Sequence, residues 1–184
     1  MGGRAKQDEE RVVFLHLQPG LDDGTSLAVA AGLADAYGAV VRQGQPLAVP
    51  AEAFDSARGQ YNARVLLRAV PPPRPAALAL GIVRVDLFVP GLNFVFGLAS
   101  GSRALISVAR LQTHDASLYR HRVATEAVHE IGHLLGLAHC PVRRCAMFFS
   151  NTLADTDAKG PGLCPRCAAR AQGLAPTPPS SLNR

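Results

Sequence analysis

Apolar residues in the first third of the chain fall into short runs that alternate with a helical stretch. Residues 12–17 are β-branched, aromatic or leucine at nearly every position and are followed by Gln18-Pro19-Gly20, which predicts a buried strand. Residues 25–37 are rich in alanine and leucine and stop before Gly38, which predicts a helix. A second strand is predicted at 39–42.

The same alternation continues through the middle of the chain. Residues 60–70 carry their apolar side chains on one helical stripe that ends at three consecutive prolines, so a second helix is expected there. Residues 78–83 are apolar throughout and predict the central strand. Residues 93–99 and 104–109 predict two further strands joined by a hairpin-like turn. A long helix is then expected from about 117 to 135, so the pattern indicates a sheet with packed helices.

The segment from 129 to 139 concentrates candidate metal ligands within that long helix and just beyond it. His129 and His133 are four residues apart, so on a helix both imidazoles project from one face and can reach one cation. His139 can join them only if the chain turns after the helix, and Gly136 permits the left-handed angles that such a turn needs. Three imidazoles and a water form the open tetrahedral zinc site that is typical of catalysis.

Glu130 stands beside the first histidine and is predicted to be a general base for a zinc-activated water that attacks an amide carbonyl. A buried helix with incidental histidines is the alternative. The additional glycine and histidine at fixed offsets make that coincidence improbable. Tyr61 and Tyr119 are candidates for stabilising the oxyanion, although their positions in the sequence place neither of them in a cleft.

A second group of ligands follows, because all the cysteines of the chain lie close together. They are Cys140, Cys145, Cys164 and Cys167. Such a cluster in a chain without a signal peptide indicates metal ligands before disulfides, and four thiolates form the closed shell of a structural zinc. A thioredoxin-like dithiol at Cys164 and Cys167 would leave the other two cysteines unexplained. Two zinc ions are therefore expected, one catalytic and one structural.

The strings His139-Cys140, Cys145-Ala146-Met147 and Cys164-Pro165-Arg166-Cys167 resemble the archaemetzincin family of zinc metallopeptidases, within the metzincin clan. Residues 86–97 and 107–111 also look like family segments, so the resemblance covers roughly residues 80 to 167. It implies a metzincin-like twisted mixed sheet with packed helices, an active-site helix and a small C-terminal subdomain stapled by zinc.

The resemblance also implies roles for residues outside the two ligand clusters. Met147 would form an apolar floor under the histidines without binding zinc. An edge strand over the cleft would bind peptide as an additional strand, through Asn93, Phe94, Val95, Phe96 and Gly97. An internal strand without a ligand is the alternative for that segment.

A length of 184 residues fits one domain. We expect this domain to span 1–170, with an N-terminal subdomain at 11–135 that holds the sheet and the active-site helix, and a C-terminal subdomain at 136–170. The prolines and serines after Arg170 predict a disordered tail at 171–184.

The net charge of +5 does not change this picture, because the arginines are scattered and aromatic residues are few. No nucleic-acid motif is present. Arg143, Arg144, Arg166 and Arg170 could favour acidic substrates, but a solvated face is the more ordinary interpretation. The polar start of the chain indicates neither secretion nor membrane insertion, so a cytoplasmic location is expected. We also expect a monomer.

The predicted function is zinc-dependent hydrolysis of peptide bonds. One alternative is a non-catalytic zinc module that binds a partner, and the intact Glu130 argues against it. Another is zinc-dependent hydrolysis of a non-peptide amide, which the metal site alone does not exclude.

Overall fold

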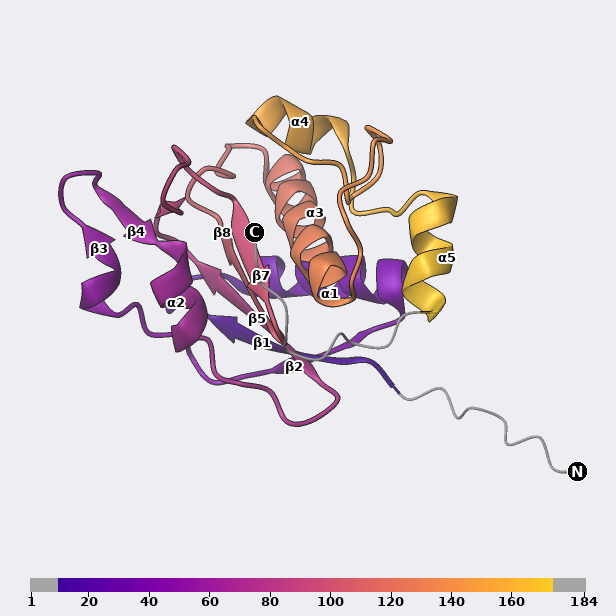
Figure 1. Cartoon of the computed structure of the whole chain (residues 1–184), viewed down its shortest axis with the longest axis horizontal. Helices are drawn as coiled ribbons and strands as arrows, with labels where there is room; N and C mark the ends of the chain where they lie inside the picture. The colour runs from indigo at the N-terminus through magenta and orange to yellow at the C-terminus, as the bar shows by residue number, and fades with distance from the viewer. Residues whose placement is uncertain (1–9, 174–184) are drawn as a thin grey trace, which may run out of the picture.

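A five-stranded mixed sheet forms the centre of the molecule in the computed structural model, which describes residues 10–173 (Figure 1). Its strand order is β2-β1-β5-β8-β7. The first four strands are parallel, whereas β7 runs antiparallel to β8 and forms an edge. The strands are β1 (Val12–Leu17), β2 (Val40–Gln43), β5 (Leu78–Val83), β7 (Gly97–Ser100) and β8 (Arg103–Ser107). This arrangement confirms the predicted mixed α/β class.

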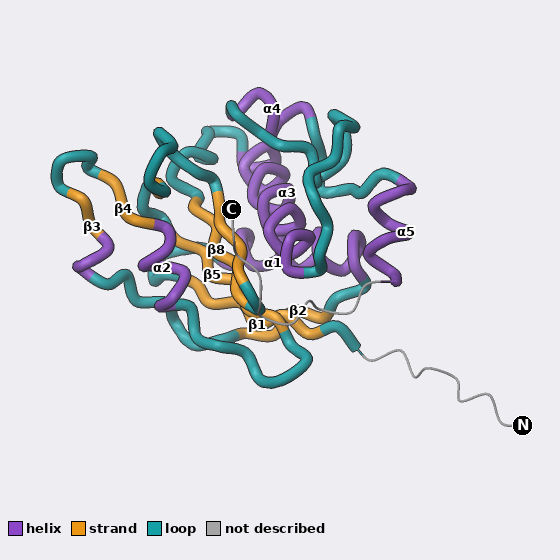
Figure 2. Tube along the Cα trace, viewed as in Figure 1, coloured by secondary structure: helices purple, strands orange, loops and turns teal. Residues whose placement is uncertain are grey.

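Helices cover both faces of this sheet (Figures 1 and 2). The even-numbered residues of β5 pack in the core with helices α1 (Asp23–Tyr37) and α3 (Ala116–Leu134), and Ala79 and Val83 pack with α2 (Ala63–Ala69). Side chains alternate between the faces of a strand, so α2 lies opposite α1 and α3. A strand covered on both faces must be apolar at every position, which accounts for the unbroken apolar run of β5.

The helix predicted at 60–70 begins later than expected. Residues 60–62 form strand β4 (Gln60–Asn62) of a second sheet with β3 (Phe54–Asp55) and β6 (Leu87–Phe88), and a 3₁₀ turn at Ala51–Ala53 precedes it. The Asn62 side chain accepts a hydrogen bond from the Arg64 amide at 2.9 Å and so caps the helix that follows.

The strand predicted at 93–99 is also shorter than expected, because β7 begins only at Gly97. The Val95 amide donates to the carbonyl of Leu87 in the small sheet at 3.0 Å. The Asn93 carbonyl accepts hydrogen bonds from Arg58 and Gln60, both at 3.0 Å. These contacts hold the segment before β7 as a loop.

The C-terminal part adds two short helices, α4 (Leu153–Ala158) and α5 (Pro165–Gly173). Helix α5 continues past Arg170 and buries Ala171, so the first three residues of the predicted tail are helical; the remainder lies outside the described residues. Cysteines and Met147 from this part share one apolar cluster with α1 and the sheet, and the division into subdomains stays a prediction. Within residues 10–173, none of the helices has the length and apolar character that crossing a membrane requires.

Candidate active site

Helix α3 and the turn after it bring the three histidines together. The helix starts at the side-chain cap of Asp115 and ends at Leu134. Gly136 then adopts a left-handed φ of 80°, and the Leu137 amide bonds back to the Gly132 carbonyl at 2.9 Å. The reversal places His139 beside His129 and His133, with the candidate ligand atoms of all three within 4.8 Å of one another.

Hydrogen bonds to main-chain carbonyls fix two of the imidazoles. His129 Nδ1 donates to the Ala146 carbonyl at 2.8 Å, and His133 Nδ1 donates to the Leu137 carbonyl at 2.9 Å. With each Nδ1 carrying the proton, each Nε2 presents a lone pair, and the two Nε2 atoms lie 3.1 Å apart. Two facing lone pairs repel unless a cation lies between them, so this donor set fits a zinc ion.

Burial keeps these imidazoles neutral. It lowers the pKa of His129 to about 2, with a further contribution from the nearby Lys159 ammonium, and it lowers the pKa of His133 to about 4. The more exposed His139 also has a pKa below its usual value because it is partly buried. Neutral imidazole is the form that binds metal, so protons do not compete for the site near pH 7.

Glu130 is buried on α3 between the two histidines. Burial, and to a smaller extent the neighbouring Glu126 carboxylate, raise its pKa to about 8 against the opposing effect of Lys159. Gly97 at the start of β7 gives this carboxylate its space, because a Cβ there would lie 2.7 Å from both Cγ and Oε1 of Glu130. A glycine on the edge strand therefore lets the carboxylate lie against the sheet.

Met147 packs under α3 at the glycine of the histidine motif. A Cβ at Gly132 would overlap the Met147 sulfur and would lie 2.6 Å from the Tyr37 hydroxyl. That hydroxyl donates to the Val128 carbonyl at 2.8 Å and lies 3.9 Å from the Met147 sulfur. The glycine thus permits close packing of the helix on a buried methionine.

A cleft of about 510 Å³ opens over the histidines. Two of the segments that line it are Leu92 to Ala99 and Phe149 to Asn151. The Phe96 carbonyl accepts a hydrogen bond from the Ser107 amide of β8, at 2.8 Å. Main-chain groups alternate in direction along an antiparallel strand, so those of Gly97 and Ala99 point away from β8. The further lining residues are Glu126, His129, Glu130, His133, His139 and Lys159.

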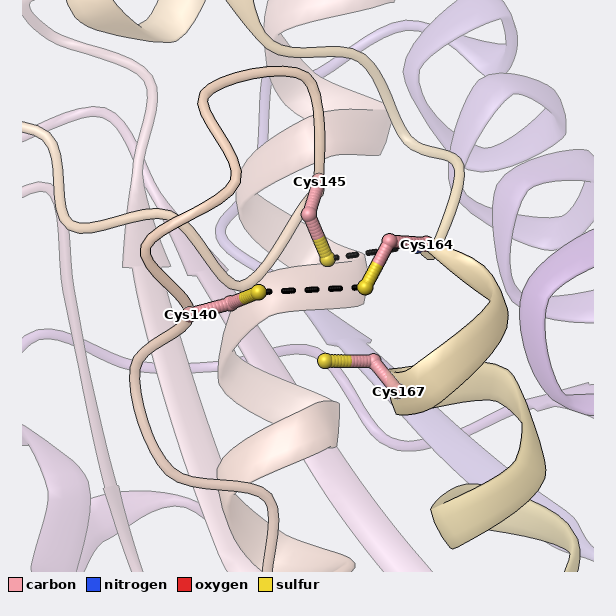
Figure 3. A group of neighbouring side chains, drawn as sticks. All are labelled: Cys140, Cys145, Cys164 and Cys167. Carbon is pink, nitrogen blue, oxygen red and sulfur yellow. Dashed lines mark hydrogen bonds between the residues drawn. The ribbon is translucent and has the colours of Figure 1, made fainter.

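The four cysteines form a second, closed cluster (Figure 3). Cys140 and Cys145 come from the loop after α3, Cys164 precedes α5, and Cys167 lies in its first turn. All four are free thiols, and their sulfur atoms lie within 4.8 Å of one another. The Cys140 and Cys164 sulfurs are 3.8 Å apart, and the Cys164 amide donates to the Cys145 sulfur at 3.3 Å.

The surroundings favour a thiolate at Cys164, whereas burial raises the pKa of Cys145 and of Cys167. Hydrogen bonds, chiefly from the Cys167 amide, lower the pKa of Cys164 to about 7. Arg166 donates to the Cys140 sulfur at 3.5 Å and brings a positive charge to the cluster. Four convergent sulfurs of this kind fit a structural zinc.

Several residues considered in the sequence lie away from the cleft. The Tyr119 hydroxyl lies 3.2 Å from the Thr25 hydroxyl, and Tyr61 packs on Phe54 with ring centroids 5.0 Å apart. Neither tyrosine lines the cleft. Arg143 is exposed and lies 3.9 Å from Asp155.

Glu126 and Lys159 were not predicted from the sequence; their buried side chains pair at 3.3 Å and line the cleft. Glu126 precedes Glu130 by one helical turn, a spacing that could have placed it on the same face. Lys159 carries no comparable signal, because its partners come from distant parts of the chain.

Comparisons with known proteins agree with this geometry. Residues 75–172 match the model of peptidase family M54. Proteins named archaemetzincin are 46% identical over 124 residues in Archaeoglobus fulgidus (66% of this chain, 75% of that protein) and 47% identical over 122 residues in Methanopyrus kandleri (65% and 70%).

Solved structures extend the likeness to the fold. The crystal structure of archaemetzincin from M. kandleri is 38% identical, with a TM-score of 0.82, over 89% of this chain and 94% of that chain. The A. fulgidus archaemetzincin, crystallised with malonate, is 38% identical, with a TM-score of 0.77, over 86% of this chain and 99% of that chain. The chain therefore belongs to peptidase family M54, the archaemetzincins, and is a zinc metallopeptidase.

Proposed function

We propose that His129, His133 and His139 hold the catalytic zinc of this peptidase and that Glu130 is its general base. The convergence of three imidazoles, whose candidate ligand atoms lie within 4.8 Å of one another in a cleft that Glu130 also lines, carries this proposal. A zinc ion held there would supply Lewis acidity, which makes water more acidic and polarises a carbonyl group.

The protein groups supply orientation and proton transfer. The carbonyls of Ala146 and Leu137 keep two rings turned with Nε2 toward the cleft. Glu130 accepts the proton of the attacking water and returns it to the leaving amine. Burial raises the pKa of this carboxyl above its usual value, which makes its carboxylate a stronger base toward the attacking water.

The edge of β7 supports a proposal about how the substrate lies. Peptide or protein substrates would add to this edge as an extended strand, using the outward main-chain groups of Gly97 and Ala99. The sequence predicted residues 93–97 for this role. In the structure the Val95 amide already bonds to Leu87, and the Phe96 carbonyl already bonds to Ser107. The proposed contacts therefore lie further along the chain, at Gly97 and Ala99.

A second zinc at Cys140, Cys145, Cys164 and Cys167 would have a structural role. His139 and Cys140 are adjacent, so the loop that carries the third imidazole also carries the first thiolate. Closing the thiolate shell would then fix the position of His139. The thiol cluster also supports a reducing compartment such as the cytoplasm. A monomeric state and the absence of nucleic-acid and membrane partners stay predictions.

Metal content and turnover of a quenched peptide library test the proposal with two variants. Glu130→Ala should keep two zinc ions and lose about 10²- to 10⁴-fold in rate, because it lacks only the base. His133→Ala should lose one zinc ion together with its activity. Unchanged hydrolysis by Glu130→Ala would reject the base, and loss of zinc from it would make Glu130 a ligand. An active enzyme that cleaves only small non-peptide amides would favour the alternative substrate class.

A further inference from the structure

A buried ion pair lies beside His129. The Lys159 ammonium is 3.3 Å from Glu126 Oε1, and the two side chains are 0% and 3% exposed. Neither residue takes part in the steps above. Two charges removed from water gain little net stability from each other, so the other contacts of this pair indicate its role.

The ammonium touches three separate parts of the active site. It binds Glu126 on α3, it donates to the Phe148 carbonyl at 3.1 Å, and it lies 3.4 Å from His129 Nδ1. The hydrogen on that Nδ1 is donated to the carbonyl of Ala146, two residues before Phe148. Lys159 therefore holds the same stretch of main chain that orients His129.

Other contacts give Lys159 a fixed place. It follows the last residue of α4, and its own carbonyl accepts a hydrogen bond from His121 Nε2 at 3.0 Å. The Thr156 hydroxyl donates to Glu126 Oε1 at 3.1 Å. One turn earlier on α3, Arg122 binds Asp157 of α4 at 2.6 Å. Successive turns of α3 are thus bonded to α4 and Lys159, up to the turn that carries His129.

We propose that Lys159 is a positioning residue of the active site. By holding Glu126 and the Phe148 carbonyl together, it fixes the main chain at Ala146 and so fixes the direction of the His129 ring. The inference rests on the proposed function, because it takes His129 as a metal ligand.

Cobalt(II) loaded into the histidine site, after mild chelation has removed its zinc, reports the ligand geometry through its visible absorption bands. Lys159→Met has similar length and no charge. It should shift these bands, weaken metal binding at this site about 10- to 100-fold and lower kcat with little change in KM. The thiolate zinc should stay bound.

Asp157→Ala is the matched control, since it breaks the other ion pair of the same interface. It should lower Tm while leaving the cobalt spectrum and kcat as in the unaltered protein. A folded Lys159→Met protein with an unchanged spectrum and kcat would overturn the inference. An Asp157→Ala protein with the same spectral shift would also overturn it, because the pair would then act only through stability.

If Lys159→Met does not fold, the double variant Lys159→Met/Glu126→Leu removes both buried charges and decides the question. An altered cobalt spectrum supports the inference, and an unchanged one refutes it. Cobalt uptake by the unaltered protein distinguishes a failure of this inference from a failure of the proposed function. If that protein takes up no cobalt at the histidines, the proposed function fails and the inference fails with it; normal uptake with an unchanged Lys159→Met spectrum refutes the inference alone.

Discussion

The histidine and cysteine clusters are both candidate metal sites, but the protein holds them in different ways. Two of the three imidazoles are each anchored by a main-chain hydrogen bond, and all three histidines come from one helix and its following turn. The cysteines come from two distant segments, and many of their polar contacts are with one another. The protein itself therefore orients the rings, whereas a bound ion would have to gather the thiolates. Removing the histidine metal alone should leave the first cluster formed, whereas removing the thiolate metal should dismantle the second.

The largest expected effect comes from breaking the thiolate cluster. Cys164→Ser should abolish stable folding, because binding of a structural zinc contributes on the order of 10 kcal/mol to folding. Circular dichroism and zinc analysis of the purified protein would measure this loss. Ala169→Ser changes an exposed residue of the same helix and should behave like the unaltered protein. A soluble, fully active Cys164→Ser protein would contradict the contrast between the clusters.

The same contrast explains how much of the site could be predicted from the sequence. The motif from His129 to Cys167 names both ligand groups that the fold brings together. Spacing on one helix and its following turn determines the proximity of the histidines, whereas α4 separates the two pairs of cysteines along the chain. Glu126 and Lys159 could not be predicted as a pair, because their contact depends on how α4 packs over α3. Helix α4 itself is short and polar, and only the capping box formed by Thr152 and Asp155 marks it.

The fold shows the same division between strong periodic signals and tertiary contacts. The long apolar elements, β1, α1, β5 and α3, lie close to where the pattern predicted them. The small sheet was missed because strands of two or three residues have no detectable period. The side chains of Gln60 in that sheet and of Arg58 in its turn donate hydrogen bonds to the Asn93 carbonyl. This contact joins distant parts of the chain, so no local sequence pattern predicts it.

Acid should destabilise the protein once the histidine metal has been removed. The pKa of His129 is about 2 when folded and that of His133 about 4, against an ordinary value of 6.5, so the unfolded chain binds protons more readily. The stability from these histidines is fully present above pH 6.5 and falls as the pH drops toward the folded values. At about 1.4 kcal/mol per pKa unit, the loss by pH 4 is about 3 kcal/mol from His129.

Urea unfolding of the protein at a series of pH values, with zinc kept only at the cysteines, measures this loss. His129→Gln should make the curve shallower between pH 6.5 and 4, with the contribution of His133 remaining, whereas His114→Ala, which changes an exposed histidine, should leave it unchanged. A flat curve for the unaltered protein would show that its histidine cluster does not stay buried and formed without metal.

A smaller effect tests how tightly the general base is packed against the sheet edge. In Gly97→Ala, the new Cβ would lie 2.7 Å from Glu130 and also 2.7 Å from the Leu105 carbonyl, so the carboxylate must move. We expect kcat to fall about 10²-fold, because displacing a catalytic group by about 1 Å has an effect of that size. Zinc content should not change. Gly162→Ala is the control, since its Cβ meets nothing within 4 Å; a Gly97→Ala enzyme with normal kcat would show that Glu130 tolerates displacement.

The smallest effect concerns the hydroxyl under the histidine helix. Tyr37→Phe removes the hydrogen bond to the Val128 carbonyl and the contact with the Met147 sulfur but keeps the buried ring. We expect a loss of about 1 kcal/mol in the free energy of unfolding, because one neutral hydrogen bond contributes on that scale. Hydrogen bonds to the carbonyls of Ala146 and Leu137 hold the imidazoles, and this substitution leaves them in place, so kcat and zinc affinity should stay unchanged. Urea titration and steady-state kinetics on one preparation separate the two quantities. A fall in zinc affinity without a fall in stability would mean that the packing under the helix, as well as the main-chain hydrogen bonds, orients the histidines.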